Sequence, residues 1–320
     1  MGSITQSSSE HPIITWDYQF APNAQKSRNL LHSLQLPYKI SEQPFVQPRP
    51  ILQNLGITYR RVPVNSIGKD VFIDNRCFLD AVEEIFPDVF KAKLVKTKHD
   101  HAYEAFGYRN FWIILASLPV AFLTPELIKE REDLFTTFGK ANYKELRPSA
   151  MEELKSFLRM IEDDFLADSS DEAPFIAGSK CGVSDIHAVW IPKFALETLK
   201  YSAEEPGFGK EDFPKVHRWI SQWPTHAPEN EGEKVAEDEA RKTLLGAGYA
   251  AREIDVDEKD STGLKKGQKV YVQTSDDNAP ENAQQHGTLT GLGPRRIVIE
   301  LENGLRLHFP RVGYAVLAAK

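Results

Sequence analysis

The residues from Phe20 to Arg28 have the types and the order expected of a site for an anion or a thiolate. They read Phe-Ala-Pro-Asn-Ala-Gln-Lys-Ser-Arg and follow the apolar run 13–16, which predicts a strand that turns into a helix. Unpaired backbone N–H groups make the start of a helix electropositive. Pro22 suits the first turn because its missing N–H removes no helical hydrogen bond. A structural strand–turn–helix without chemistry is the alternative.

A second group of residues follows at 61–75: Arg61, Val62, Pro63, Asp74 and Asn75. With the first stretch, this group resembles the N-terminal, thioredoxin-like domain of cytosolic glutathione transferases. In that family the helix after the first strand carries the thiol-activating residue. A cis Val-Pro bond presents its backbone to the cysteinyl part of glutathione, and an acidic or amide residue followed by a small polar one holds the γ-glutamyl end. The resemblance implies that these five residues bind glutathione.

The resemblance also implies individual roles for the charged and amide side chains of this group. Asp74 would be the counter-charge for the γ-glutamyl ammonium group, and Asn75 would bind the neighbouring carboxylate through its amide and its N–H at a helix start. Arg61, with Arg60 as a competitor, would pair with the glycyl carboxylate. The structural alternatives are an Asp-Asn helix cap and a solvated arginine on a strand. Pro63 is expected to be cis.

The residue that activates the thiol is harder to assign. Glutathione's thiol has a pKa of about 8.5, so only a few per cent is thiolate near neutrality and a donor must stabilise the anion. Phe20 stands where tyrosine-type enzymes have a hydroxyl, and Ala21 stands where omega-type proteins have cysteine. The pattern Ala-Pro-Asn-x-x-Lys resembles transferases that use asparagine, although those have Gly at the position of Ala24. Asn23 is therefore the catalytic candidate, through an amide N–H that donates to the thiolate. The alternative is an N-cap.

Other side chains that could do chemistry are weaker candidates for a catalytic or metal-binding role. Ser27 lies one helical turn farther on, and Tyr18 precedes the turn. Cys77 falls on the apolar side of an expected helix and Cys181 in a loop, and both are interpreted as structural thiols. The sequence His-Asp-His at 99–101 resembles a metal site, but side chains two apart on a helix diverge. No metal is expected, and glutathione is the only co-substrate implied.

Composition limits the classes of function. The chain has 320 residues, of which 41% are hydrophobic and 10% aromatic, so two or three folded domains are expected. A net charge of −7 argues against nucleic acid or an anionic membrane as the main partner. Two cysteines make no disulfide framework, and neither a signal peptide nor a membrane-spanning apolar run is recognised. A cytoplasmic protein is expected.

The pattern of apolar residues predicts three folded parts. After a polar tail at 1–12, residues 13–88 read as β-α-β-α-β-β-α, the order of an α/β thioredoxin-like domain, with strands that include 60–64. Residues 98–224 predict an all-α domain like the C-terminal domain of a glutathione transferase. In it, Gly182 and Asp185 occupy the ends of a helix-capping box.

One helix of the all-α domain is expected to border a second-substrate pocket, because it does so in the family that the chain resembles. Four of its residues are candidates for an apolar, aromatic lining: Tyr103, Tyr108, Arg109 and Trp112. The alternative is that half of them belong to the helical core.

In the last part of the chain, the spacing of apolar residues changes from a helical pattern to an alternating one. A charged linker is expected at 225–262 with a helix near 233–245, and alternating apolar residues in 263–320 with a hairpin signal at Asn303-Gly304 predict a small, SH3-like β-barrel. The barrel could cap the helical domain or bind a peptide or nucleic acid. Some filamentous-fungal transferases resemble this chain in carrying such a part, which implies a fungal source.

These features predict a glutathione S-transferase-like enzyme that conjugates glutathione to a small apolar electrophile or uses it for an isomerisation. The resemblance implies a homodimer and a substrate from fungal secondary metabolism. A non-catalytic scaffold of the same fold is one alternative, favoured by the residues Phe20 and Ala21 and opposed by the presence of Asn23, Asp74 and Asn75. A glutathione-dependent thiol–disulfide oxidoreductase is another, which Ala21 disfavours.

Overall fold

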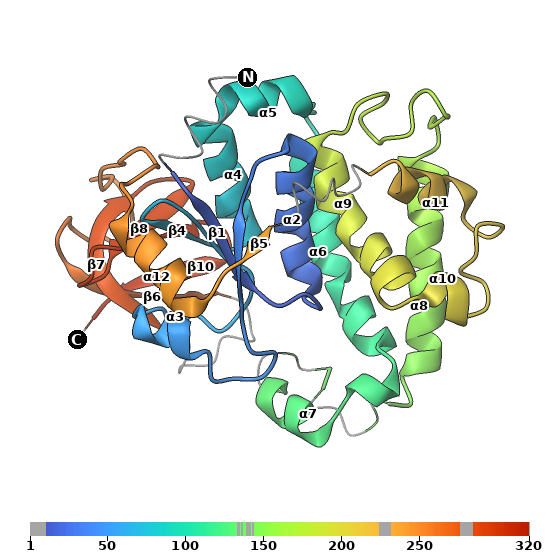
Figure 1. Cartoon of the computed structure of the whole chain (residues 1–320), viewed down its shortest axis with the longest axis horizontal. Coiled ribbons are helices and arrows are strands. Elements are labelled where there is room, and N and C mark those ends of the chain that lie inside the picture. The colour runs from blue at the N-terminus through green and yellow to red at the C-terminus, as the bar shows by residue number, and fades with distance from the viewer. Residues whose placement is uncertain are drawn as a thin grey trace. The chain divides into compact units, whose positions relative to one another are not determined.

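The computed structural model describes residues 11–132, 135, 137–138, 142, 144–223, 232–275 and 284–319. The chain divides into two compact units (Figure 1). The first, here called the sheet unit, contains residues 1–27, 36–87 and 230–320. The second, the helical unit, contains residues 28–35 and 88–229.

The N-terminal part of the sheet unit has the element order predicted from the sequence. The elements are β1 (Ile13–Asp17), α2 (Pro22–Leu34), β2 (Lys39–Glu42), α3 (Pro50–Asn54), β3 (Val64–Ile67), β4 (Asp70–Ile73) and α4 (Asn75–Ile85). Only the first part of α2, up to Ser27, belongs to the sheet unit, and the rest of this helix belongs to the helical unit. Strand β1 pairs in parallel with β2 and antiparallel with β3, which pairs antiparallel with β4. The strand expected at 60–64 begins only at Val64, because the residues before Pro63 form a loop, and Arg61 is therefore a loop residue.

The C-terminal strands do not stand apart as the distinct barrel that the sequence predicts. The elements are β5 (Glu233–Lys234), α12 (Glu237–Gly246), β6 (Lys269–Thr274), β7 (Gln285–Leu292), β8 (Arg296–Glu300), β9 (Arg306–Pro310) and β10 (Tyr314–Ala318). They belong to one ten-stranded sheet with the order β10-β6-β7-β8-β9-β4-β3-β1-β2-β5. Strand β9 pairs in parallel with β4, and β5 with β2. The C-terminal strands therefore continue the N-terminal sheet in both directions.

A shared hydrophobic core explains why these strands join the sheet. Strand β4 would be a sheet edge, and every one of its residues is buried. An apolar edge strand must be covered. Val71 and Ile73 pack in one core cluster with Leu307 and Phe309 from β9, and Leu244 of α12 is buried in the same cluster. The stretch expected to be a charged linker thus contributes to the core.

A buried carboxylate joins β4 to β9. Asp70 is fully buried and accepts hydrogen bonds from Arg306 Nε at 2.7 Å and Nη2 at 3.0 Å. His308 Nε2 lies 2.7 Å from it, and the N–H groups of Ala250 and Ala251 donate to it at 2.7 and 2.8 Å. Burial alone raises the pKa of Asp70, but the contacts with His308 and Arg306 outweigh burial and lower it to about 2. Asp70 is thus an ionised carboxylate inside the sheet unit.

The helical unit matches the all-α prediction. Its longer helices are α5 (Pro87–Lys93), α6 (Asp100–Ser117), α7 (Pro125–Arg131), α8 (Arg147–Met160), α9 (Val183–Lys193) and α11 (Pro214–Ser221), with a short α10 (Tyr201–Glu204). Gly182 is the N-cap of α9, and Asp185 accepts from its N–H at 2.9 Å and from Trp219 Nε1 at 2.8 Å. The predicted capping interaction is therefore present. Among the described residues, no helix is both long and apolar enough to cross a membrane.

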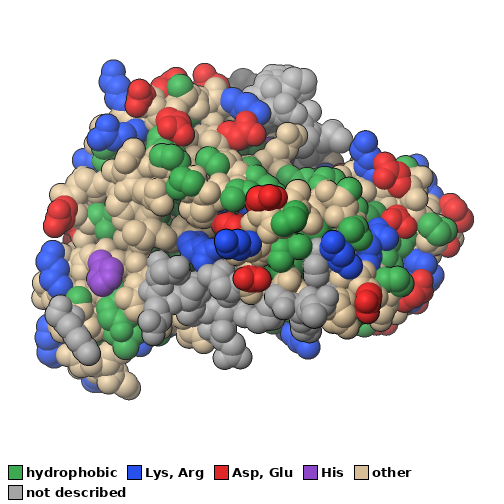
Figure 2. All heavy atoms as spheres, turned by 90° about the horizontal axis from the view of Figure 1, so that it is seen from below, with side chains coloured by type: hydrophobic (Ala, Val, Ile, Leu, Met, Phe, Trp, Pro, Cys, Tyr) green, Lys and Arg blue, Asp and Glu red, His purple; other side chains and the backbone are tan. Residues whose placement is uncertain are grey.

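Charges of both signs are mixed on the face of the molecule seen in Figure 2. Lys and Arg side chains alternate with Asp and Glu side chains, and apolar side chains lie between them. The side chains drawn in colour there form no broad region of a single charge sign. A surface of this kind attracts a polyanion only weakly.

The ion pair between Asp70 and Arg306 predicts a stability change with a defined pH dependence. In Asp70→Asn we expect the free energy of unfolding near neutral pH to fall by about 3 kcal/mol, since Arg306 keeps a buried charge without its partner. The pKa of Asp70 is about 2 in the folded chain against 3.8 for the ordinary group. A lowered pKa adds about 2 kcal/mol of stability that is fully present above the unfolded pKa and is lost as the pH falls through the folded value.

Urea unfolding of wild type and Asp70→Asn across the acid range tests this expectation. The difference in unfolding free energy between the two proteins should be constant at neutral and weakly acidic pH, and should shrink below about pH 4. Asp255→Asn is the matched control, because the Asp255 side chain is 94% exposed and pairs with the surface residue Lys266. A difference that stays constant down to pH 2 would contradict the ion-pair account.

Candidate functional site

The turn between β1 and α2 leaves polar groups in the first turn of α2 available to a ligand. The Ala21 carbonyl accepts from the N–H groups of Ala24 at 3.1 Å and Gln25 at 3.3 Å, so Ala21 is the N-cap and Pro22 the first helical residue. Asn23 therefore lies in the first turn of α2 and is not an N-cap. No described residue is hydrogen-bonded to its side-chain amide. The amide and the N–H of Asn23 are both available to an anion at this helix start.

An asparagine at the start of α4 ties that helix to the first turn of α2. Asn75 Nδ2 donates to the Asn23 carbonyl at 2.9 Å, and the Ser27 hydroxyl donates to Asn75 Oδ1. Ser27 in turn accepts from Asn65 Nδ2 at 3.0 Å. Ser27 thus has a structural role in the described chain. The Asn75 side chain is already engaged, and its backbone N–H is the part that remains for a ligand carboxylate.

The loop before β3 reaches the same place. The peptide bond between Val62 and Pro63 is cis, which confirms the prediction for Pro63. Val62 packs against a small cluster that contains Tyr18, Ala21 and Ala24. This contact brings the cis-proline loop onto the start of α2. The backbone on either side of Pro63 therefore lies beside the helix start that carries Asn23.

Arg49 holds this loop in place, and the sequence analysis missed it. Arg49 is 4% exposed. Its side chain donates to the carbonyls of Pro44 at 3.3 Å and of Arg60, and lies over the Tyr18 ring at 5.8 Å. A buried arginine with carbonyl acceptors fixes the backbone around it. Arg61, the candidate for the glycyl carboxylate, lies in the loop that Arg49 braces.

Asp74 is the N-cap of α4, with φ of +74° and ψ of 144°. Its Oδ1 accepts from the N–H of Arg76 at 3.0 Å, and its Oδ2 accepts from the hydroxyl of Tyr314 at 3.4 Å. A positive φ is uncommon for a residue other than glycine and occurs where the surrounding structure enforces it, as at ligand sites. Asp74 therefore has the capping role that was one of its two interpretations, and part of its side chain remains exposed.

Two tyrosines near Asp74 were not predicted. Tyr314 comes from β10, and its hydroxyl oxygen lies 2.9 Å from that of Tyr59 in the loop before β3. Burial, with the negative charge of Asp74, raises the pKa of Tyr314 well above its ordinary value, although the nearby Arg61 opposes this. Tyr314 is therefore a protonated donor at neutral pH. The alternation of apolar residues in β10 was visible in the sequence, but its neighbour in space, 240 residues away, was not.

The surroundings of the two cysteines and of the His-Asp-His sequence at 99–101 bear on whether these residues are reactive or bind a metal. Burial raises the pKa of both Cys77 and Cys181 well above the ordinary value, so both are poor nucleophiles. Asp100, the first residue of α6, accepts from the N–H and the hydroxyl of Thr97 and thus ties the preceding turn to the helix start. In the described ranges, no group of His, Cys, Asp and Glu side chains is arranged to hold a metal ion.

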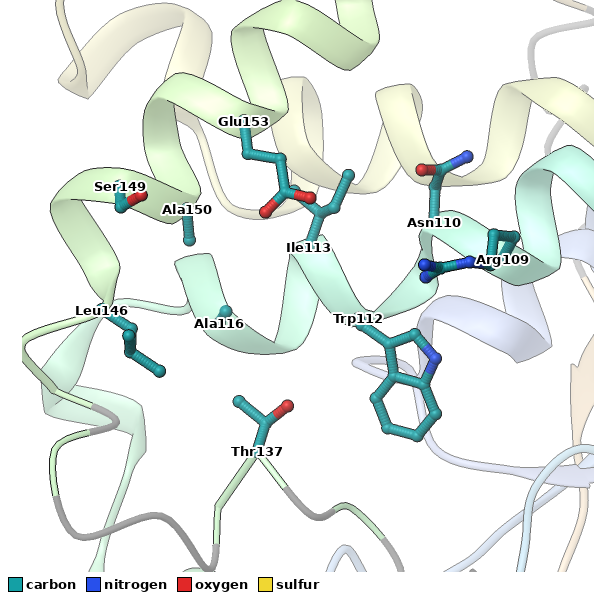
Figure 3. A pocket seen from close by; sticks show the side chains of 10 residues that line it. All are labelled: Arg109, Asn110, Trp112, Ile113, Ala116, Thr137, Leu146, Ser149, Ala150 and Glu153. Atoms are coloured by element: carbon teal, nitrogen blue, oxygen red, sulfur yellow. The ribbon is translucent and has the colours of Figure 1, made fainter. Parts of the chain in front are cut away.

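The helical unit contains a cavity of about 200 Å³ between α6 and α8 (Figure 3). Arg109 and Trp112 line it from α6, Ser149 and Glu153 from α8, and Thr137 from the connecting segment. The lining combines an aromatic ring with two opposite charges and two hydroxyls. Arg109 and Trp112 were both predicted to line a second-substrate pocket.

The other two candidates on α6 lie elsewhere. Tyr103 packs edge-on against Phe165 with ring centroids 4.8 Å apart, and Tyr108 is 57% exposed. Tyr103 lies about two and a half helical turns before Trp112 and therefore faces the opposite side of α6. The prediction grouped four residues because they are close in sequence. The helical period places Tyr103 on the other side of the helix, where it packs against an aromatic ring.

Comparisons with known proteins establish the fold. Residues 111–231 match a family described as a domain of unknown function, DUF7962. No curated protein matches the chain by sequence. The crystal structure of a GST-like protein from Pseudomonas syringae matches with a TM-score of 0.63 and 19% identity, over 96% of this chain and 99% of that one. A glutathione transferase from Phanerochaete chrysosporium matches with a TM-score of 0.49 and 17% identity, over 65% of this chain and 97% of that one.

The match to the Pseudomonas syringae protein extends over nearly the whole chain, so it includes C-terminal strands as well as the N-terminal sheet and the helical unit. At this level of identity, the likeness speaks for architecture. The chain therefore has the fold of a GST-like protein.

Proposed function

We propose that this protein binds glutathione in the sheet unit and stabilises its thiolate at the start of α2. The convergence of three segments carries the proposal. The hydrogen bond from Asn75 to the Asn23 carbonyl brings the start of α4 to the start of α2. The packing of Val62 brings the cis-proline loop to the same place. These are the segments that the resemblance to glutathione transferases assigns to the γ-glutamyl, thiol and cysteinyl parts of glutathione.

Each segment offers groups suited to one part of the tripeptide. The carboxylate of Asp74 is a counter-charge for the ammonium group, and the N–H of Asn75 faces the carboxylate at a helix start. The backbone around Pro63 would pair with the cysteinyl amide, and Arg61 would meet the glycyl carboxylate. Asn23 would donate to the sulfur from its amide and its N–H, which lowers the pKa of the bound thiol.

The reaction that follows would be an attack of the thiolate on a small apolar electrophile, or an isomerisation that passes through such an adduct. Conjugation forms a carbon–sulfur bond as the leaving group departs, and the thiol proton leaves to solvent before the attack. We propose that the cavity with Arg109 and Trp112 receives the electrophile, because it offers an aromatic wall beside polar groups. A homodimer, a cytoplasmic location and a role in secondary metabolism belong to the same proposal and rest on the resemblance alone.

Two other functions are alternatives, and the observations favour the first of them more than the second. A non-catalytic scaffold is favoured by Phe20 and Ala21, which stand where tyrosine-type and omega-type proteins place their reactive groups. A thiol–disulfide oxidoreductase would need a reactive thiol, and both Cys77 and Cys181 are buried with raised pKa values. The open helix start at Asn23 favours the transferase-like function over both.

Glutathione binding should depend on the charge of Asp74. Calorimetric titration of the wild type should give a dissociation constant in the micromolar to millimolar range, about −8 to −4 kcal/mol. Asp74→Asn keeps an oxygen for the helix cap but loses the charge, so we expect binding to weaken by at least about tenfold. Asp255→Asn should bind as the wild type does. No heat and no thermal shift with the wild type would refute the glutathione proposal.

The role of Asn23 predicts a change in the bound thiol. In Asn23→Ala we expect the pKa of bound glutathione to rise by about one unit, because one hydrogen bond to the thiolate is lost. Ultraviolet absorbance of the thiolate, followed against pH on the saturated protein, measures it. The substitution is compatible with the helix, since alanine has the higher helix propensity. Gln19→Ala, at an exposed position in the preceding turn, is the control. An unchanged pKa in Asn23→Ala would remove Asn23 from the catalytic role.

The cavity of the helical unit predicts a separate effect on the second substrate. With chlorodinitrobenzene as the probe electrophile, Trp112→Ala should raise KM for the electrophile by about tenfold, since a buried aromatic contact is lost. KM for glutathione should stay unchanged. Met160→Ala is the matched control, because its apolar side chain at the end of α8 is 45% exposed and outside the cavity. Equal changes for both substrates would argue against this assignment of the cavity.

A further inference from the structure

The carboxylate of Asp74 is held by a partner on each oxygen. Oδ1 accepts from the backbone N–H of Arg76 at 3.0 Å, and Oδ2 accepts from Tyr314 at 3.4 Å. An ionised carboxylate has about four acceptor positions, so two partners fix its plane and leave room for a ligand. The first partner is an ordinary helix-capping contact. The second comes from the last strand of the chain and is not needed for the cap.

The hydroxyl groups of Tyr59 and Tyr314 and the Asp74 carboxylate form a chain of hydrogen bonds in which all donors point the same way. Tyr59 and Tyr314 lie 2.9 Å apart, and either hydroxyl could donate to the other. The carboxylate of Asp74 only accepts when it is ionised, so Tyr314 must donate its one proton to Asp74. Tyr59 must then donate to Tyr314. Hydrogen bonds in such a chain polarise one another, so the hydroxyl of Tyr59 strengthens the donor that faces Asp74.

Both tyrosines are anchored by the C-terminal strands. Tyr314 pairs with Thr274 across β10 and β6, and its ring packs on Phe309 at 5.6 Å between centroids. The residue before Tyr59 is tied to β7, since the N–H of Thr58 donates to Gln285 Oε1 at 2.8 Å. The hydroxyl chain therefore has a rigid support that the N-terminal part of the sheet does not supply.

We propose that Tyr314, with Tyr59 behind it, is a positioning residue that orients the Asp74 carboxylate toward the primary ammonium group of an amino-acid-type ligand. The inference rests on the proposed glutathione function and names the γ-glutamyl end as the group recognised. The C-terminal strands are then part of the ligand site and not an appended module. Tyr314 does not touch the reacting sulfur, so it governs binding and selectivity and leaves the bound thiolate unchanged.

The test compares glutathione with glutaryl-cysteinyl-glycine, which lacks the α-amino group and retains the rest of the peptide backbone and the thiol. The full-length wild type and Tyr314→Phe are titrated with both ligands by calorimetry. The phenylalanine keeps the buried ring and removes only the hydroxyl. We expect Tyr314→Phe to bind glutathione about tenfold more weakly and the analogue within about twofold of wild type, as for loss of a hydrogen bond to a charged group. Tyr59→Phe should also lower the affinity for glutathione relative to the analogue, by a smaller factor.

Two controls separate positioning from stability. Tyr201→Phe removes another buried tyrosine hydroxyl, which donates to the Ser117 carbonyl at 2.6 Å in the helical unit. It should lower the melting temperature without changing the ratio of the two affinities. In Asp74→Asn the ratio should approach one, and adding Tyr314→Phe should change it no further, because the two residues act through one contact.

The outcomes distinguish the two proposals. If the wild type prefers glutathione and Tyr314→Phe keeps that preference, the positioning role is overturned and the glutathione function stands. If both ligands weaken equally in Tyr314→Phe, the tyrosine acts through stability alone and the positioning role is again overturned. If the wild type binds neither ligand, the glutathione function fails and the inference fails with it.

Discussion

The ion pair that Asp70 forms with Arg306 is the contact on which the sheet unit depends. It places a buried charge at the start of β4 and its partner at the start of β9, on strands that also share an apolar core. A buried carboxylate without a partner is strongly destabilising, so β4 is fully stable only with β9 beside it. The ion pair joins β9 to β4, and β10 is connected to β9 in the sheet through β8, β7 and β6. Tyr314 reaches Asp74 as a consequence.

The sequence contained the local part of the site. The strand–turn–helix with Asn23 and the N-cap at Asp74 depend on residues that are neighbours in the chain, and both have a short-range signature. The cis bond before Pro63 was expected from the resemblance to glutathione transferases, since most X–Pro bonds are trans. Arg49 and Tyr314 have no such signature. A buried arginine and a strand tyrosine look the same in sequence wherever they lie, and their partners are decided by the tertiary fold.

The C-terminal strands show a similar limit. Alternation of apolar residues in 269–318 correctly indicated strands, because the period of two is a local property. The alternation does not say whether the edge strand of the C-terminal group pairs with another strand of that group or with a strand of the N-terminal sheet. The residues predicted on α6 failed for another reason. Arg109 and Trp112 line the cavity but Tyr103 faces away from it. The helical period alone could have shown that Tyr103 lies on the other side of the helix. The bacterial protein with this architecture also means that the extra strands do not by themselves indicate a fungal source.

The order of the chain gives this architecture a consequence during synthesis. Asp70 leaves the ribosome 236 residues before Arg306, and residues 88–229 of the helical unit are made in between. Until then the nascent sheet ends at β4, with an uncovered apolar edge and an unpaired carboxylate. Uncovered strand edges bind other chains and chaperones. The N-terminal elements therefore gain the cover of β4 and the partner of Asp70 only after β9 has been made.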